Sequence, residues 1–442
     1  MCGSWAGTRG ALRDSDSLLA SFAASSAARA PPERDRRCRG RALIYTISNS
    51  DSETVNVIPR QATDRIRRLL RGFPVVTVTG PRQSGKTTLV RSLLPERPYV
   101  TLESPAHREF ARQRPAEFLQ QFPHGAVIDE AQHAPELFSE MQGVVDSAAE
   151  MGLFVLTGSQ NLALLSRITQ SLAGRTALVE LLPLSVSELR AAGRLDARYA
   201  GHLVKGFFPA IYSRDLSPHD WLQGYLVTYA ERDARQLAAI QDLGAFQRFL
   251  KLTAARTGQL LNMQALASDA GVSDKTVKHW LSILETCYLI HFVRPHSAHF
   301  GKRLIKMPKL YMTDVGLAAA LMGITDEQQV MAHPLRGALF ETLVVNELLK
   351  SRCNLGLREP LHFWRDNIGT EVDVIIERGS EIAAVEIKSG PVVASDAFGA
   401  LNKWRKYATE RGAFSAIHPA LVYGGDVRFT REGVDVMPWS SL

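Results

Sequence analysis

The sequence is poor in cysteine and has no long hydrophobic run. Its four cysteines are scattered and share no metal-ligand spacing, which favours a reducing compartment over a disulfide framework. No apolar stretch approaches the ~18 residues that a membrane-spanning helix needs. We therefore expect a cytoplasmic protein that does not enter a membrane.

The composition is otherwise that of a globular protein. With 442 residues, of which 45% are hydrophobic and 22% charged, the chain has material for roughly two to four domains. The net charge of +7 is compatible with a polyanionic partner but does not identify one. The first 58 residues are rich in Ala, Ser and Arg and lack lysine. We expect residues 1–58 to be a disordered extension or the product of a start codon assigned too early.

A phosphate-binding loop follows a short apolar strand. Residues 73–79 are typical of a buried parallel strand, and residues 87–94 form a helix that ends before Pro95. The loop between them is Gly80, Pro81, Arg82, Gln83, Ser84, Gly85, Lys86 and Thr87, followed by Thr88. In such a loop the backbone N–H groups face phosphate oxygens, Lys86 reaches the β- and γ-phosphates and Thr87 binds Mg²⁺. The sequence therefore predicts a site for ATP and Mg²⁺ rather than a chance glycine loop.

Several further residues suit ATP hydrolysis. Residues 126–130 are an apolar strand that ends in two acids, where Asp129 is suited to hold Mg²⁺ and Glu130 to deprotonate the attacking water. Such acids also occur as solvated loop residues. Ser159, or in second place Asn161, is placed to sense the γ-phosphate. Arg175 is either an arginine finger on a neighbouring subunit, which would imply a homo-oligomer, or part of an internal salt bridge.

These segments, in this order, resemble a prokaryotic AAA+ ATPase family in which a C-terminal region of unknown function follows the ATPase. The resemblance rests on Gly80–Thr87, Ile128–Gln132, Leu156–Ser159 and Leu172–Arg175. It extends from about Pro59 to the C-terminus. It implies an ATPase core with a helical lid and leaves the biological role open.

A helix-turn-helix pattern lies in the middle of the chain. Residues 263–270 form a short helix, Gly271 provides the turn and Ser273 can cap a second helix. The buried face of that helix would carry Val277, Trp280, Leu281 and Leu284. Its outer face would carry Lys275, Lys278 and His279, and a wing of strands 289–294 and 309–312 would have the basic tip Lys302 and Arg303. The pattern predicts a winged helix that binds double-stranded DNA or, alternatively, packs against protein.

An acidic hairpin follows near the C-terminus. Residues 371–377 and 381–388 alternate acids with aliphatic residues, and Gly379 and Ser380 suit a two-residue turn. If Arg378 pairs with Glu381, Asp373 stands opposite Glu386, and these acids repel unless a cation lies between them. Lys388 projects from the same face, and a preceding helix, residues 337–349, carries Glu341.

This set resembles the PD-(D/E)xK restriction-endonuclease fold, although no proline precedes Asp373. The resemblance implies a Mg²⁺ site made by Glu341, Asp373 and Glu386, with Lys388 helping to activate water against a phosphodiester. The alternative is a surface hairpin with alternating charges. A fold can also persist in proteins that have lost its catalytic activity, so the resemblance leaves nuclease activity open.

Together the motifs predict an α/β protein with four parts after the extension. These are a P-loop AAA+ ATPase core, a helical lid or linker, a winged helix-turn-helix and a restriction-endonuclease-like domain, at residues 59–190, 191–255, 256–325 and 326–442. The predicted function is ATP hydrolysis coupled to action on DNA. The alternative is a slow ATP-dependent signalling switch whose C-terminal domain only binds a partner.

Overall fold

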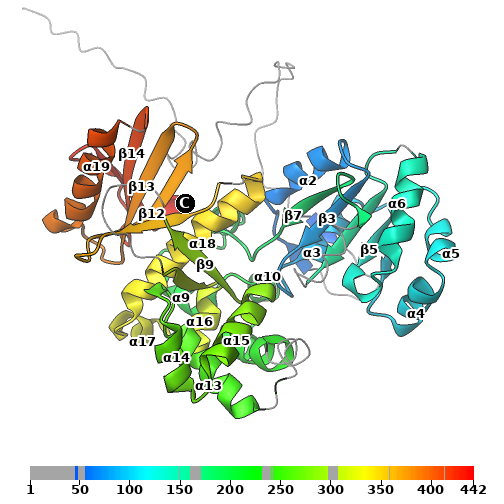
Figure 1. The fold of residues 1–442 in the computed structure, drawn as a ribbon, viewed down its shortest axis with the longest axis horizontal. Helices are drawn as coiled ribbons and strands as arrows, with labels where there is room; N and C mark the ends of the chain where they lie inside the picture. The colour runs from blue at the N-terminus through cyan, green and yellow to red at the C-terminus, as the bar shows by residue number, and fades with distance from the viewer. Residues whose placement is uncertain are drawn as a thin grey trace, which may run out of the picture.

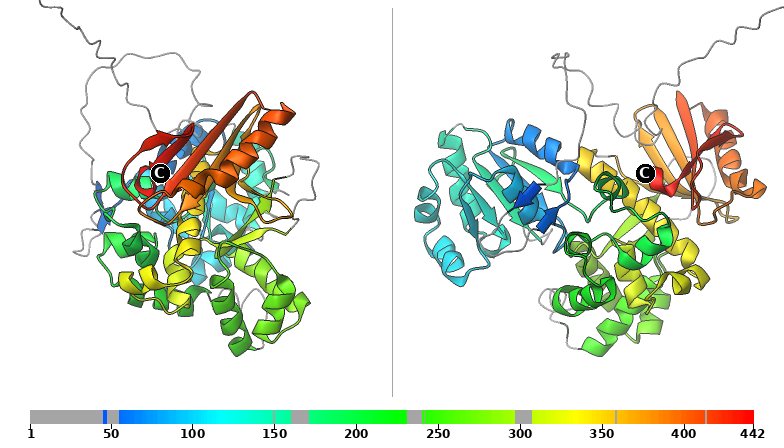
Figure 2. Two further views of the ribbon diagram at one scale, coloured as in Figure 1. Left: turned by 90° about the vertical axis from the view of Figure 1, so that its left-hand side faces the viewer. Right: turned by 180° about the vertical axis from the view of Figure 1, so that it is seen from behind.

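The computed structural model describes residues 45–47, 55–148, 150–159, 171–230, 240, 242–296, 307–357, 359–412 and 414–442. Most of the predicted extension lies outside this part of the chain, as do Asn161, Lys302 and Arg303. Within it, no helix combines the length and the apolar character that crossing a membrane requires. The parallel strands around the P-loop (blue to cyan) and the C-terminal strands (orange to red) lie on opposite sides of the molecule, with helix α18 between them (Figures 1 and 2).

A five-stranded parallel sheet forms the first part. Its order is β4-β5-β6-β3-β7, so the strand before the P-loop, β3, lies between β6 and β7. Both faces of the sheet are covered by apolar side chains, as expected of a parallel sheet. The strands are β3 Val75–Thr79, β4 Tyr99–Thr101, β5 Ala126–Asp129, β6 Phe154–Gly158 and β7 Thr176–Glu180, preceded by the small pair β1 Tyr45–Ile47 and β2 Val55–Val57. The helices are α2 Ala62–Leu70, α3 Lys86–Leu93, α4 Pro105–Gln113, α5 Pro115–Gln120, the 3-10 turn Ala131–His133 and α6 Leu137–Ala148.

Short helices follow this parallel sheet, where the sequence predicts a helical lid. They are α8 Val186–Ala191, α9 Tyr199–Lys205, α10 Pro209–Ser213, α11 Pro218–Tyr225, the π-helical turn Leu226–Ala230 and α13 Leu243–Ala254. Ser185 caps α8 in a reciprocal arrangement with Glu188.

The predicted helix pair is present. It consists of α14 Met263–Ala270 and α15 Asp274–Thr286, joined by Gly271 in the left-handed conformation. Ser273 caps α15 by accepting a hydrogen bond from the N–H of Thr276, as predicted. Strand β10 pairs with both β8 and β9, and two helices follow; the elements are β8 Gln259–Leu260, β9 Ile290–Pro295, β10 Lys309–Met312, α16 Val315–Leu321 and α17 Glu327–Ala332.

The last part is built on a hairpin whose register was predicted from its turn. Arg378 pairs with Glu381, and the pairing continues to Val374 and Val385, one step from Asp373 and Glu386. Its elements are α18 Arg336–Leu355, β11 His362–Arg365, β12 Glu371–Arg378, β13 Glu381–Lys388, the 3-10 turn Ser395–Phe398, α19 Gly399–Arg411, β14 Ala416–Tyr423, β15 Phe429–Arg431, β16 Val434–Pro438 and the 3-10 turn Trp439–Ser441.

The middle and C-terminal parts share one sheet and one core. β9 pairs in parallel with β11, so the three strands near the helix pair continue into a nine-stranded sheet of order β15-β16-β14-β13-β12-β11-β9-β10-β8. One apolar core extends from the short helices through α15 to α18 and one face of this sheet, while α19 covers the other face. Sheet and core therefore cross the boundary at residues 325 and 326 that the sequence predicts.

Candidate nucleotide site and acid cluster

The P-loop lies between β3 and α3, and two of its glycines are required by the backbone. Gly80 has a φ of 145°, and a Cβ atom there would lie 2.2 Å from the carbonyl oxygen of Leu181. Gly85 has a φ of 90° at the start of α3, a conformation that other residues adopt with strain. The glycine positions of the motif therefore follow from the tight turn between strand and helix.

Lys86 is buried beneath this loop. Its ammonium group donates hydrogen bonds to the carbonyl oxygens of Gly80, at 3.0 Å, and Pro81, at 2.8 Å. Burial lowers the pKa of Lys86 to about 8, although Glu130 and Asp129 oppose this shift. The charge of Lys86 is thus poorly solvated, and a phosphate group is the partner that would restore its solvation.

Asp129 is surrounded by hydroxyl groups. Its carboxylate accepts hydrogen bonds from Thr87 at 2.9 Å, from Tyr99 at 2.8 Å and from Thr157. Burial and the hydrogen bond to Asp129 raise the pKa of the Tyr99 hydroxyl. The Thr87 hydroxyl and the Asp129 carboxylate are oxygen ligands of the kind that Mg²⁺ prefers, so these two residues fit a Mg²⁺ ion that accompanies a bound nucleotide.

Glu130 is held in a fixed orientation beside Asp129. Its backbone has a φ of 55°, which is unusual for a residue with a side chain. Its Oε2 accepts hydrogen bonds from Gln132 and, at 3.1 Å, from Ser159. Ser159, the predicted γ-phosphate sensor, therefore contacts the predicted catalytic base.

A cavity of about 1090 Å³ opens at this site. It is lined by the P-loop, by the acids Asp129 and Glu130 and by residues that precede α2. The short helix α10 and Arg214, the residue that follows it, close another side. The cavity therefore joins the ATPase core to the helices that follow it.

Arg175 lies away from this cavity. Its guanidinium group pairs with Asp146 on α6 of the same chain, with distances of 2.6 and 2.7 Å. Both residues are at the surface. Of the two interpretations that the sequence leaves open for Arg175, this contact corresponds to the internal salt bridge.

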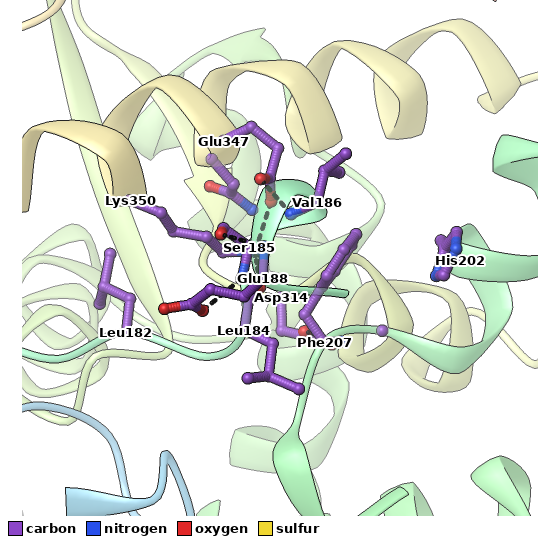
Figure 3. Close-up of polar contacts among 12 residues, drawn as sticks. Leu182, Leu184, Ser185, Val186, Glu188, His202, Phe207, Asp314, Glu347 and Lys350 are labelled. Atoms are coloured by element: carbon purple, nitrogen blue, oxygen red, sulfur yellow. Dashed lines mark hydrogen bonds and ion pairs between the residues drawn. The ribbon is translucent and has the colours of Figure 1, made fainter. Parts of the chain in front are cut away.

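Buried charges connect the P-loop to α18. Arg60 donates to the carbonyl oxygen of Ser84 at 2.7 Å and pairs with Glu188 at 3.1 Å. The N–H of Val186 donates to Glu347 at 2.6 Å, and Glu347 pairs with Lys350 at 2.7 Å. Figure 3 shows Glu347 and Lys350 pointing from α18 to the segment that contains Ser185 and Val186. The nucleotide loop is thus linked to α18 indirectly, through Arg60 and the segment that contains Val186 and Glu188.

The C-terminal acids also come together, with one member that the sequence did not indicate. One carboxylate oxygen each from Glu341, Glu371 and Asp373 lies within 4.8 Å of the other two. We call these three residues the acid cluster. The predicted ligand Glu386 lies beside the cluster, and its Oε1 accepts a hydrogen bond from Lys388 at 2.6 Å. Burial, then Glu341 and Glu386, raise the pKa of Asp373 well above its usual range.

Exposed basic residues lie on the second helix of the helix pair. Lys275, Lys278 and His279 are exposed, while Val277 and Trp280 are buried in the shared core. The predicted division of α15 into a buried and an exposed face is therefore confirmed.

Sequence reasoning missed several residues because their partners are distant in the chain. Tyr99 and Thr157 reach Asp129 from the neighbouring strands β4 and β6. Lys309, on β10, contacts the acid cluster. Side chains alternate between the two faces of a strand, so the sequence does indicate that Lys309 and Tyr311 lie on the same face of β10. That alternation was the one sequence signal that could have pointed to them.

Three families match successive parts of the chain. An AAA domain matches residues 72–190, the domain of unknown function DUF8612 matches 196–328 and DUF4143 matches 336–442. The parallel sheet with its P-loop therefore lies in the part of the chain that matches an AAA domain. Among solved structures, a Walker-type ATPase of Pyrococcus abyssi is similar over 60% of this chain and 96% of its own, with 15% identity and a TM-score of 0.41. The AMPPCP-bound DnaA of Aquifex aeolicus is similar over 51% and 85%, with 12% identity and a TM-score of 0.24.

Two mycobacterial relatives match most of the chain. The uncharacterized proteins Mb2031c of Mycobacterium bovis and Rv2008c of Mycobacterium tuberculosis are each 32% identical over 375 residues, which cover 84% of this chain and 81% of the relative. This chain, in which an AAA domain precedes two domains of unknown function, therefore belongs to the family of Mb2031c and Rv2008c.

Proposed function

We propose that this chain binds and hydrolyses ATP with Mg²⁺ in the cavity beneath the P-loop. The observation that carries the proposal is the contact between the Thr87 hydroxyl and the Asp129 carboxylate, with Glu130 fixed beside them. Lys86 and the loop N–H groups bind the phosphates, and Thr87 and Asp129 hold Mg²⁺, which supplies charge stabilisation. Glu130 orients and deprotonates the attacking water, and Ser159 positions Glu130. Arg175 has no part in this proposal because its contacts go to Asp146.

The test is steady-state ATP hydrolysis by the full chain and by Glu130→Gln. Loss of a general base should lower turnover by about 10²–10⁴-fold, while binding of a non-hydrolysable analogue is retained. Glu140→Gln, a change at an exposed acid on α6, is the matched control and should leave turnover unchanged. If the wild-type chain binds ATP tightly but hydrolyses it no faster than Glu130→Gln does, a slow signalling switch would be favoured instead.

A second proposal is that the helix pair and strands β8–β10 form a winged helix that binds double-stranded DNA. The observation that favours it is the exposed basic side of α15, whose opposite side is buried. Because α15 itself carries no arginine or asparagine for base readout, binding through it would depend on phosphate contacts and weaken steeply with salt. The double change Lys275→Glu and Lys278→Glu should abolish the anisotropy change of a labelled duplex at low salt. Lys251→Glu, at an exposed position of α13, should not.

We further propose that the C-terminal part has the restriction-endonuclease-like fold that the sequence suggests. Support comes from Glu341, Asp373, Glu386 and Lys388, which the helix α18 and the hairpin β12–β13 bring close together. Cleavage of DNA is not proposed, because an ammonium group already lies among the acids that a metal ion would need.

A further inference from the structure

The acid cluster lies where the middle and C-terminal parts meet. Glu341 comes from α18, while Glu371 and Asp373 come from β12. The side chain of Lys309 reaches the cluster from β10, on the far side of β9 and β11 in the same sheet. The cluster is thus shared by segments of both parts.

Lys309 contacts all three acids. Its Nζ lies 2.8 Å from Oε1 of Glu341 and 3.8 Å from Oδ1 of Asp373, and it is ion-paired with Glu371. The Lys309 side chain is 3% exposed. The hydroxyl of Tyr311, two residues along β10, donates to the same Glu341 oxygen at 2.6 Å. Two residues of one strand therefore hold the Glu341 carboxylate.

A divalent ion does not fit the cluster while Lys309 is there. Mg²⁺ binds oxygens at about 2.0–2.1 Å from a single central point. The ammonium group of Lys309 already lies within hydrogen-bond distance of these oxygens. A metal ion at the same point would clash with the ammonium group and be repelled by its positive charge. One of the two cations has to leave.

The charges of the surroundings agree with an occupied site. Four carboxyl groups, those of the cluster and Glu386, face the basic groups of Lys309, Lys388 and Arg365. Burial opposes the charge on Lys309, but Glu341, Asp373 and Glu371 outweigh it and raise its pKa. Lys309, Arg365 and Lys388 pair with Glu341, Glu371 and Glu386. Basic side chains of the protein itself therefore already pair with these acids.

We propose that the ammonium group of Lys309 is the resident cation of the acid cluster, and that Lys309 and a divalent metal ion exclude each other there. This inference rests on the C-terminal site described above and does not depend on ATP hydrolysis. In this view the ammonium group of Lys309 occupies the place that a metal ion has in a metal site. Its ion pairs connect β10 to α18 and β12. If Lys309 were removed, Glu386 could supply one further oxygen ligand to a metal ion. Its buried Oε2 has no hydrogen-bond partner among the residues that the structure describes.

The test is Mn²⁺ binding, followed by the electron paramagnetic resonance of free Mn²⁺, without nucleotide. All proteins are full-length and carry Asp129→Asn, which removes the ion expected at the nucleotide site. Lys309→Met in this background should gain one Mn²⁺ per chain, bound at least tenfold more tightly than in the parent. Adding Glu341→Gln should abolish the gain. Lys406→Met, at an exposed lysine of α19, should bind like the parent.

Two results would overturn the inference. One is a folded Lys309→Met protein that gains no Mn²⁺ site. The other comes from the protein with Lys309 intact, so the inference can be tested even if Lys309→Met does not fold. In that protein, amine labelling followed by mass spectrometry should show that Lys309 is protected from the reagent. Binding of Mn²⁺ through Glu341 while Lys309 stays protected would contradict mutual exclusion.

Discussion

The carboxylate of Asp129 accepts hydrogen bonds from three hydroxyl groups, whereas the carboxylates of Glu341 and Glu371 share the ammonium group of Lys309. Hydroxyl groups are neutral and can rotate, so they leave room and oxygen ligands for a metal ion beside Asp129. An ammonium group cancels charge and fills the space between the oxygens. Two acidic sites in one chain are therefore suited to different cations.

The largest effect is expected at the hydroxyl-lined site. Asp129→Asn removes the charge that holds Mg²⁺, and such an ion supplies several kcal/mol of transition-state stabilisation, so ATP turnover should fall by about 10³-fold. Phosphate release by the wild type and the variant measures this. Turnover within tenfold of the wild type would show that Asp129 does not hold the ion.

The next effect concerns stability at the lysine-filled site. Lys309→Met removes a buried cation and leaves partly buried carboxylates without it. Breaking a fully buried ion pair typically costs about 3–5 kcal/mol of unfolding free energy, and we expect a loss at or below the lower end of that range. The midpoint of urea unfolding measures the loss. Lys406→Met removes an exposed ion pair with Glu410 and should change the midpoint little. Equal midpoints for the two variants would mean that the cluster does not need Lys309.

The pH should act on the nucleotide site through Lys86. Because the pKa of Lys86 is lowered to about 8, the free protein loses this positive charge as the pH rises through that value. Phosphates favour the charged form, so nucleotide affinity should be level below pH 7 and fall by up to about tenfold per pH unit above pH 8. Isothermal titration with a non-hydrolysable analogue tests this. Any binding that remains in Lys86→Arg, whose charge persists, should not show the decline.

The smallest effect is expected at the surface. Arg175→Ala breaks an exposed ion pair with Asp146, and such pairs contribute little to stability. Turnover and the unfolding midpoint should stay close to those of the wild type. A loss of turnover that grows with protein concentration would instead identify Arg175 as a finger on a neighbouring subunit.

The sequence predicts features that depend on near neighbours. The P-loop follows from fixed glycine positions, and the hairpin register follows from the two-residue turn at Gly379 and Ser380, which sets Arg378 opposite Glu381. The cap of Ser273 on α15 is equally local.

Features that depend on tertiary contacts could not be predicted in the same way. Lys309 precedes Glu341 by 32 residues, and the pairing of β9 with β11 decides that its strand joins the C-terminal sheet. The sequence indicates that the acids require a cation, but the identity of that cation depends on which strands pair. Tyr99 and Thr157 were missed for the same reason, since they meet Asp129 only through the order of the parallel strands.

The most direct test of the difference between the two acidic sites is the number of Mn²⁺ ions bound per wild-type chain. With a non-hydrolysable ATP analogue we expect one Mn²⁺, and we expect Asp129→Asn to remove it while Glu341→Gln leaves it in place. A Mn²⁺ that persists in Asp129→Asn and is lost in Glu341→Gln would contradict the account, because the acid cluster would then take a metal ion with Lys309 present.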